Sequence, residues 1–472
     1  MVVDESMTAL PRTAAVIGLV LAASVVGATT GAAPEPPGEL ARLVPDVATI
    51  ENRYVSDVAI HWNMAAYGAP LAVVNGVPRG AVYMFGMHGG EWVVEQTVVP
   101  DDVGSVTRFG DAVALDGNTL FVGAYRSAGL KGATFVFHRI GQAWIQQARL
   151  QSDEDLWLNA FGWSVDVDGD VAIVGAMGIG ERRGSAYIFR RSGHEWREEA
   201  RLTSSHVGSP ALFGWSVAIQ GDIALVGAPG LFFNQSFPRP GRVTAFHRTS
   251  AGWEEGQVLM SPDPCSVDEF GVSLDLDDEF AVIGSTGACT FLEGGRAHVF
   301  RRNNRRWSTV AEFSAPSDLR RNGFGGAVAI KGGLIAVGAE RQDTSGPDCG
   351  GVFLYRRAGD RWALNAEVSV DGTGERLRFG HALDLHGDRL VVAAPGSASI
   401  GDPVFGFASI FGGLRTPSDV DGDGVVDGRD LVLLLASWGE CPGCAADVND
   451  DGAVSVDDLL TIIKRPGQER PR

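Results

Sequence analysis

Residues 161–176 read FGWSVDVDGDVAIVGA, and residues 213–228 repeat the phrase as FGWSVAIQGDIALVGA. Further copies begin at Phe109, Phe270, Phe324 and Phe379, and a degenerate copy begins at Tyr54. Consecutive copies start 55, 52, 52, 57, 54 and 55 residues apart, so the chain holds seven units of one repeat. Such a period is typical of repeat architectures, in which each unit packs against its neighbours.

Each unit predicts four strands in the same order. In the unit at Phe161, the phrase predicts a strand, a tight GD turn and a second strand. A variable loop, a third strand over residues 184–191 and another turn lead to a fourth strand that contains a Trp. That Trp recurs at Trp92, Trp144, Trp196, Trp253, Trp307 and Trp362. One such residue in each of six units indicates packing between neighbouring units, not a ligand contact.

Four strands in about 54 residues are typical of one blade of a β-propeller, where radial repetition leaves only short strand edges. The seventh unit stops after its third strand, residues 406–412, and has no fourth strand. The N-terminal segment ELARL, residues 39–43, matches the fourth strands of other units. We therefore predict an all-β, seven-bladed propeller over residues 39–412, in which the N-terminal strand completes the last blade. An open stack would leave both ends unpaired.

The phrase is similar to the FG-GAP repeats of integrin α-subunit propellers and, more closely, to their bacterial extracellular relatives. This resemblance implies the fold but no single activity, because propellers host many functions. Some integrin blades carry a DxDxDGxxD calcium loop between their first two strands. The nearest match here, Asp166, Asp168 and Asp170, lies in a turn too short to wrap an ion. We interpret it as a hairpin turn.

The variable loops are expected to lie on one face of the propeller, because strand parity brings the fourth-to-first and second-to-third connections together. They include residues 231–240, 261–269, 285–294 and 341–350. An unknown extracellular ligand, protein or glycan, is expected there, since rigid scaffolds present binding groups on loops. Phe232, Phe233 and Phe237 either form a contact patch in the first loop or tuck against the blade.

No catalytic residue is indicated. The sequence lacks a GxSxG elbow, an HExxH pair, a P-loop and a Rossmann fingerprint. His138 and His247 fall at third-strand positions where other units have Arg, which predicts solvated side chains. Because Asp and Glu are abundant, a carboxylate pair for glycoside hydrolysis stays an open alternative.

Two acidic twelve-residue loops follow the propeller, at residues 419–430 and 447–458. Both have oxygen ligands at loop positions 1, 3, 5, 7, 9 and 12 and a Gly at position 6, which is EF-hand spacing. The candidate ligands are Asp419, Asp421, Asp423, Val425, Asp427 and Asp430, and then Asp447, Asn449, Asp451, Ala453, Ser455 and Asp458. Val425 and Ala453 would offer their carbonyl oxygens. We therefore expect two Ca²⁺ ions, because the carboxylates of one loop would repel each other without a cation.

Two details distinguish these loops from ordinary EF-hands. Position 12 is Asp, and a helix follows each loop, over residues 431–438 and 459–464, while none precedes the first. This duplicated unit resembles a type I dockerin over residues 419–464, after a linker at 413–418. The resemblance implies calcium-dependent folding and docking to a cohesin-like protein. Loop positions 10 and 11, which help to choose the cohesin in that family, are here Gly428, Arg429, Val456 and Asp457.

The five cysteines suggest two disulfides. Cys441 and Cys444 form a CPGC pair between the acidic loops, which we interpret as a small staple, although such a pair is also found in redox and zinc sites. Cys265 and Cys289 lie on two loops of one unit and form the second candidate pair. Cys349 remains as the odd cysteine.

Residues 1–33 are interpreted as a secretion signal, because the apolar stretch 14–28 is short for a bilayer span. The mature protein is therefore expected outside the cell or at its surface, without a transmembrane segment. A net charge of −19 argues against nucleic acid as a partner.

These features favour a secreted, non-catalytic propeller that binds an extracellular ligand and is attached through its dockerin-like module. The alternatives are a polysaccharide-degrading enzyme or accessory component of an extracellular carbohydrate-active complex, and a structural cell-surface protein.

Overall fold

A computed structural model describes most of the repeat region and parts of the C-terminal segment. The described residues are 37–45, 54–101, 108–152, 159–178, 184–206, 212–230, 240–264, 268–287, 294–315, 322–343, 347–370, 376–396, 406–414, 420, 428–440 and 453–463. They form seven four-stranded antiparallel sheets and two two-stranded ribbons. Each sheet is one blade, and we number the blades in the order in which the repeat phrases occur.

The first four blades take their strands in sequence order. Blade 1 consists of β2 (Asp57–His61), β3 (Met64–Ala69), β6 (Ala81–His88) and β7 (Glu91–Val98), with a ribbon of β4 (Val73–Val74) and β5 (Val77–Pro78) in a loop. Blade 2 consists of β8 (Ala112–Asp116), β9 (Thr119–Gly123), β10 (Thr134–Ile140) and β11 (Ala143–Leu150), with the short helix α1 (Ser127–Leu130). Blade 3 consists of β12 (Phe161–Asp168), β13 (Val171–Ala176), β14 (Ser185–Ser192) and β15 (Glu195–Leu202). Blade 4 consists of β16 (Val217–Gln220), β17 (Ile223–Ala228), β18 (Arg242–Thr249) and β19 (Gly252–Leu259).

The remaining blades complete the ring. Blade 5 consists of β20 (Leu274–Asp277), β21 (Phe280–Ser285), β22 (Arg296–Asn303) and β23 (Arg306–Ser314). Blade 6 consists of β24 (Phe324–Lys331), β25 (Leu334–Ala339), β26 (Gly351–Ala358) and β27 (Arg361–Val368). Blade 7 consists of β28 (Leu383–His386), β29 (Arg389–Ala394), β30 (Phe407–Gly412) and β1 (Gly38–Leu43). The C-terminal module consists of α2 (Gly428–Ala436), β31 (Gly439–Glu440), β32 (Ala453–Val454) and α3 (Val456–Ile463).

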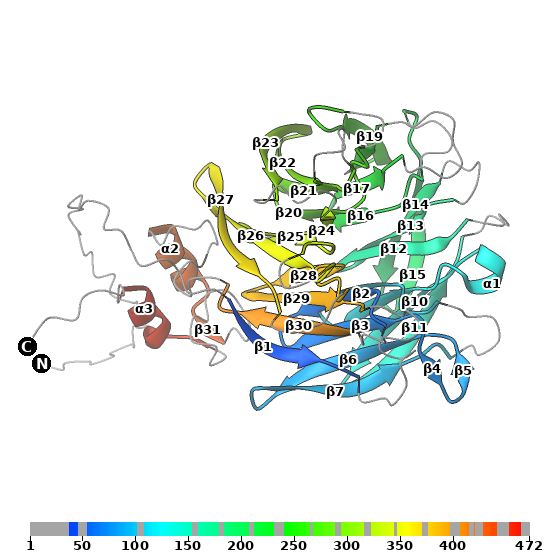
Figure 1. The fold of residues 1–472 in the computed structure, drawn as a ribbon, viewed down its shortest axis with the longest axis horizontal. Coiled ribbons are helices and arrows are strands. Elements are labelled where there is room, and N and C mark those ends of the chain that lie inside the picture. The colour runs from blue at the N-terminus through cyan, green and yellow to red at the C-terminus, as the bar shows by residue number, and fades with distance from the viewer. Residues whose placement is uncertain are drawn as a thin grey trace, which may run out of the picture. The chain divides into compact units, whose positions relative to one another are not determined.

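The ring closes as the sequence predicts. The N-terminal strand β1 pairs antiparallel with β30, with Leu43 opposite Ala408, and becomes the outer strand of blade 7 (Figure 1). Leu43 is buried in a cluster that joins blade 7 to blade 1. The innermost strand of each blade contacts that of the next, including β28 of blade 7 and β2 of blade 1. The seven-bladed, four-stranded propeller is therefore confirmed.

The two glycines of the repeat phrase meet across each blade interface. A Cβ added to Gly123, at the end of β9, would lie 2.2 Å from the carbonyl oxygen of Gly162 in blade 3. Gly162 itself has a φ of +84°, a conformation that side chains disfavour. The same contact recurs between the other neighbouring blades of the described chain whose phrases carry both glycines. Close backbone packing between blades thus explains why the phrase begins with FG and ends with GA.

The recurring Trp packs against the preceding blade, as predicted. The ring of Trp196 in blade 3 meets Phe121 of blade 2 edge to face, with 4.9 Å between centroids. The ring of Trp362 in blade 6 meets Phe280 of blade 5 in the same way, at 5.7 Å. The hydrophobic core is accordingly divided into clusters that lie between consecutive blades. No helix among the described residues is long and apolar enough to cross a membrane.

Candidate functional site

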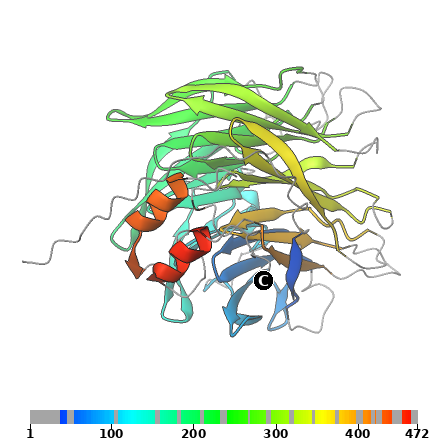
Figure 2. The same ribbon diagram turned by 90° about the vertical axis from the view of Figure 1, so that its left-hand side faces the viewer.

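The C-terminal module holds the carboxylates that end the two acidic loops. Asp430 lies in α2 and Asp458 in α3, and both are fully buried. The Asp458 carboxylate accepts hydrogen bonds from the backbone N–H of Ser455, at 2.8 Å, and from its hydroxyl, at 3.2 Å. The two helices pack side by side (Figure 2). Burial of an acidic side chain at the same position in both loops fits a site that supplies a cation to each carboxylate.

The other predicted calcium ligands lie largely outside the described residues. These are Asp419, Asp421, Asp423, Val425, Asp427, Asp447, Asn449 and Asp451. Ala453 and Ser455 are described and lie on β32 and just before α3, within the same short segment as Asp458. No group of three or more potential ligands comes together among the described residues. The full ligand sets therefore stay predictions.

The module presents apolar side chains to solvent on both helices. Leu434 is buried, whereas Val432 on α2 and Val456 on α3 are 65% and 56% exposed. The other exposed apolar residues of the module are Leu433, Leu435, Trp438 and Leu460. Of the four residues expected to choose a partner, Gly428 and Arg429 begin α2, while Val456 and Asp457 begin α3. Exposed apolar groups on a small module are typical of a protein-binding surface.

A family model, the dockerin type I domain, matches residues 417–465. A second, the FG-GAP repeat, matches residues 92–137, 144–189, 196–236 and 307–355. The chain carries an FG-GAP propeller and a C-terminal type I dockerin domain. No curated protein sequence matches it significantly.

All four FG-GAP matches begin at an outer-strand Trp, and three of them run into the third strand of the next blade. The family unit is therefore offset from the blade by one strand, which agrees with the Trp packing described above. Type I dockerin domains bind calcium, and the domain implies a cohesin partner in an extracellular complex. FG-GAP and dockerin proteins are typically extracellular.

The centre of the FG-GAP propeller is a channel of about 300 Å³ lined by the innermost strands. Four Asp side chains in it each accept two backbone hydrogen bonds. One oxygen of Asp275 accepts from Leu276 in its own blade and the other from Ile330 in the next blade, both at 2.7 Å. Asp166, Asp384 and Asp57 make equivalent pairs of bonds into blades 4, 1 and 2. These carboxyl groups connect neighbouring blades. The strands β12 and β13 pair antiparallel with Asp168 opposite Val171, so the turn between them is a hairpin turn, as predicted.

The environment of the channel favours the protonated form of these carboxyl groups. Burial raises the pKa of Asp57 and Asp275 to about 7, and that of Asp384 to about 6. Burial and the nearby Asp275 carboxylate raise the pKa of Asp166 well above its usual range. The hydrogen bonds from the backbone act in the opposite direction but are outweighed.

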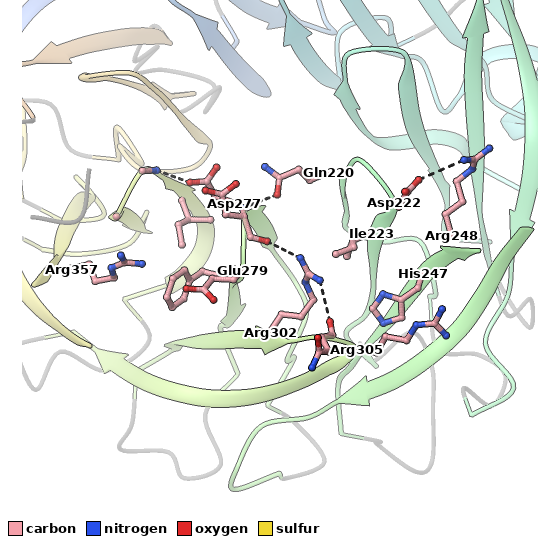
Figure 3. Close-up of a pocket in the computed structure, with 16 residues that line it drawn as sticks. Gln220, Asp222, Ile223, His247, Arg248, Asp277, Glu279, Arg302, Arg305 and Arg357 are labelled. Carbon is pink, nitrogen blue, oxygen red and sulfur yellow. Dashed lines mark hydrogen bonds and ion pairs between the residues drawn. The ribbon is translucent and has the colours of Figure 1, made fainter. Parts of the chain in front are cut away.

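A larger pocket, of about 770 Å³, lies on the face that carries the first-to-second and third-to-fourth turns (Figure 3). It is formed by blades 4, 5 and 6, and polar side chains dominate its lining. The sequence predicts a ligand on the opposite face. Large parts of the loops on that face, with Phe232, Phe233 and Phe237, lie outside the described residues. The sequence does not reveal this candidate site, because its residues belong to regular strands and turns.

His247 in this pocket corrects one sequence-based expectation. Its side chain was predicted to be solvated, but it is only 7% exposed. The reason is Gly256 on the neighbouring strand β19, where a Cβ would lie 3.0 Å from the His247 ring. Burial, with the nearby Arg305 and Arg302 guanidinium groups, lowers the pKa of His247. The imidazole is therefore neutral at neutral pH.

The predicted disulfides are not tested by the structure. Cys441, Cys444, Cys265 and Cys289 lie outside the described residues. Cys349 is described, and it is buried beside Gly350 at the entry to β26.

Proposed function

We propose that this protein is a secreted, non-catalytic propeller that binds an extracellular ligand and is attached through its dockerin domain to a cohesin-type partner. The match of the dockerin type I domain to residues 417–465 carries the proposal. In this proposal residues 1–33 are a cleaved signal, 39–412 the propeller, 413–418 a linker and 419–464 the dockerin module. The predicted export is consistent with the typical extracellular location of both kinds of domain.

Calcium would link the partner to the fold of the module. We propose two ions, one held by residues 419–430 and the other by residues 447–458. The buried Asp430 and Asp458 carboxylates would end the two ligand sets, where a cation compensates their desolvation. Because so small a module has little core of its own, metal binding would also stabilise its helices.

The exposed apolar side chains of α2 and α3 would form the surface for the cohesin. Val432 and Leu435 lie about one helical turn apart, and Val456 begins α3. Gly428, Arg429, Val456 and Asp457 would then select the partner from the first turn of each helix. Burial of an apolar centre surrounded by polar groups is the common anatomy of a specific interface.

A pull-down against a panel of cohesin domains tests the attachment. The full chain should retain one or more cohesins in calcium and release them with EGTA. Val432→Glu should weaken that binding by about tenfold or more, because it places a charge in the apolar centre. Val93→Glu, at an exposed Val of β7 in the propeller, is the matched control and should leave it unchanged. Calcium-independent retention, or equal binding by both variants, would contradict the proposal.

A glycan array and a hydrolysis screen on the same protein test the propeller. Binding without turnover is the expected result. Turnover of a polysaccharide that one carboxylate substitution abolishes would instead identify the protein as a polysaccharide-degrading enzyme. The absence of both binding and turnover would favour a structural cell-surface role.

A further inference from the structure

Five arginines occupy the same position in five consecutive blades. Each follows the buried part of the third strand and donates its backbone N–H to the turn between the first two strands of its own blade. They are Arg139, Arg191, Arg248, Arg302 and Arg357. Equivalent residues on a repeat scaffold provide an internal comparison, because the backbone around them is the same and only their neighbours differ.

In blades 2, 3 and 4 a carboxylate neutralises this arginine. Arg139 pairs with Glu95 at 3.0 Å, and Arg248 pairs with Glu199 at 2.5 Å. Glu95 and Glu199 are the bulge residues of the outer strands of the preceding blades, β7 and β15. A bulge redirects a side chain, and here it brings the carboxylate to the next blade. Arg191, which follows a blade with Gln147 at this position, pairs with Asp170 at 2.6 Å instead.

In blades 5 and 6 the neutralising residue is missing. The preceding outer strands have Gly256 and Val310 at the position of Glu95. No described carboxylate forms an ion pair with Arg302 or Arg357. Arg302 donates to the carbonyl oxygens of Asn304, at 3.1 Å, and Asp278. The guanidinium of Arg357 lies over the ring of Phe280, 4.9 Å from its centroid.

These two arginines line the 770 Å³ pocket. Figure 3 shows them on either side of Glu279. We propose that the pocket binds an anionic sugar, whose carboxylate or sulfate group is held by Arg302 and Arg357. Guanidinium groups suit such oxyanions, because their N–H donors match two oxygens at once. The volume is within the usual range for a small-molecule site of about 300–1,000 Å³. This inference rests on the proposed role of the propeller as the ligand-binding part.

The remaining lining favours a sugar over an acidic peptide. Asp278 and Glu279 place carboxylates in the same pocket as the two arginines, and Glu279 is also paired with Arg301 at 3.0 Å. The hydroxyl groups of a sugar can donate to such acceptors, whereas several neighbouring carboxylates of an acidic peptide would be repelled. Gln220 and Asn304 add further polar groups at the rim. A ligand with one oxyanion and several hydroxyls on each ring therefore complements both signs of charge.

Isothermal titration of the full chain with trigalacturonate tests this inference. The matched neutral ligand is the methyl ester of the same trimer, and a sulfated galactose tetramer separates the two oxyanions. One or both acidic sugars should bind, and binding should weaken with added salt. The ester should bind about tenfold or more weakly. Equal binding of trimer and ester, equally tight binding of hexaglutamate, or no binding of either acidic sugar would overturn the inference.

Two kinds of variant locate the site. Arg302→Ala and Arg357→Ala should each weaken binding about tenfold or more, whereas Arg191→Ala, at the neutralised equivalent, should leave it within about twofold. Val310→Glu removes no buried contact, since Val310 is 41% exposed, and it supplies Arg357 with the carboxylate that Glu95 supplies to Arg139. It should therefore reduce binding as Arg357→Ala does. Unchanged binding in Val310→Glu and Arg302→Ala would refute the site. Cohesin binding by the same variants would show that the attachment is intact.

Discussion

Replacing Asp275 by Ala removes one carboxyl group that accepts hydrogen bonds from two neighbouring blades. Its two oxygens accept from the backbone N–H groups of Leu276 and Ile330, each at 2.7 Å. Ala at this position is compatible with the blade itself, since Ala218 and Ala329 occupy it in the neighbouring blades. The substitution therefore isolates the loss of two hydrogen bonds from any change in packing.

The expected loss of stability follows from the two orphaned donors. A buried polar group without a partner costs about 1–3 kcal/mol. Asp275 is partly accessible from the channel, so water can replace part of each bond, and we expect about 2–4 kcal/mol in total at pH 5, where the folded chain keeps this carboxyl group mostly protonated. The entropy of unfolding, about 2.1 cal/mol/K per residue, converts this to a decrease of about 3–5 °C in the Tm of the propeller.

Urea and thermal unfolding followed by Trp fluorescence measure this change. Asp222→Asn is the control, because Asp222 is 68% exposed and its ion pair with Arg248 is a loose surface contact at 3.7 Å. The control should change stability by about 0.5 kcal/mol or less. If Asp275→Ala were as stable as the control at pH 5, where the Asp275 side chain is mostly protonated, the carboxyl group would not connect the blades as argued.

Three further predictions concern pH, the repeat glycines and calcium. Burial raises the pKa of Asp57 and Asp275 to about 7, from about 3.9 in the unfolded chain, so their contribution to stability is fullest below pH 4 and is lost as the pH rises through 7. The urea midpoint of Asp275→Asn should therefore depend less on pH than that of the unchanged protein. Equal slopes of the urea midpoint against pH would refute this. Gly123→Ala should destabilise the propeller by about 3 kcal/mol or more, measured by thermal unfolding, because its Cβ would lie 2.2 Å from the Gly162 carbonyl oxygen; Gly117→Ala, at a positive φ with open space around it, is the milder comparison. Asp419→Ala combined with Asp447→Ala should unfold residues 419–464 and leave the propeller intact, so limited proteolysis should remove only the module. If the module of the unchanged protein resisted protease in EDTA, calcium binding would not be coupled to its folding.

The repeat phrase alone predicts most of the fold, because its period, turns and glycines encode contacts that recur in every unit. The closing role of β1 also follows from sequence, since ELARL matches strands that the seventh unit lacks. One position of the repeat alternates between Asp and Ala along the sequence, at Asp166, Ala218, Asp275, Ala329 and Asp384. The role of the Asp residues cannot be inferred from this alternation, because it depends on a hydrogen bond between blades. The burial of His247 could not be read from its own strand, because Gly256 on the next strand makes the space.

The candidate calcium site in the dockerin domain follows from the sequence for a different reason. Its expected ligands are local, so twelve consecutive residues define each loop, and Asp430 and Asp458 are buried at the positions that the spacing assigns. The pocket of the propeller depends on three blades, and its residues are spread from Gln220 to Arg357. A pattern in one segment cannot show that Val310 removes the partner of an arginine in another blade.

Two features depart from the repeat: Asp57 lies at a shifted position, and Gly256 and Val310 replace the Glu of other outer strands. Only the first is explained by closure of the ring. Asp166, Asp275 and Asp384 each connect their own blade to the next, which pairs six of the seven blades and leaves out blade 2. Asp57, two residues before the usual position, connects blade 1 to that remaining blade by accepting from Val113. Closure thus explains Asp57. Gly256 makes the space for the buried His247, but no contact in the ring requires Val310, since Glu at the equivalent position is accommodated in blades 1 and 3. Gly256 and Val310 leave the guanidinium groups of Arg302 and Arg357 without carboxylates, and both groups line the same pocket of the described chain. A ligand in that pocket explains this pattern better than the fold does.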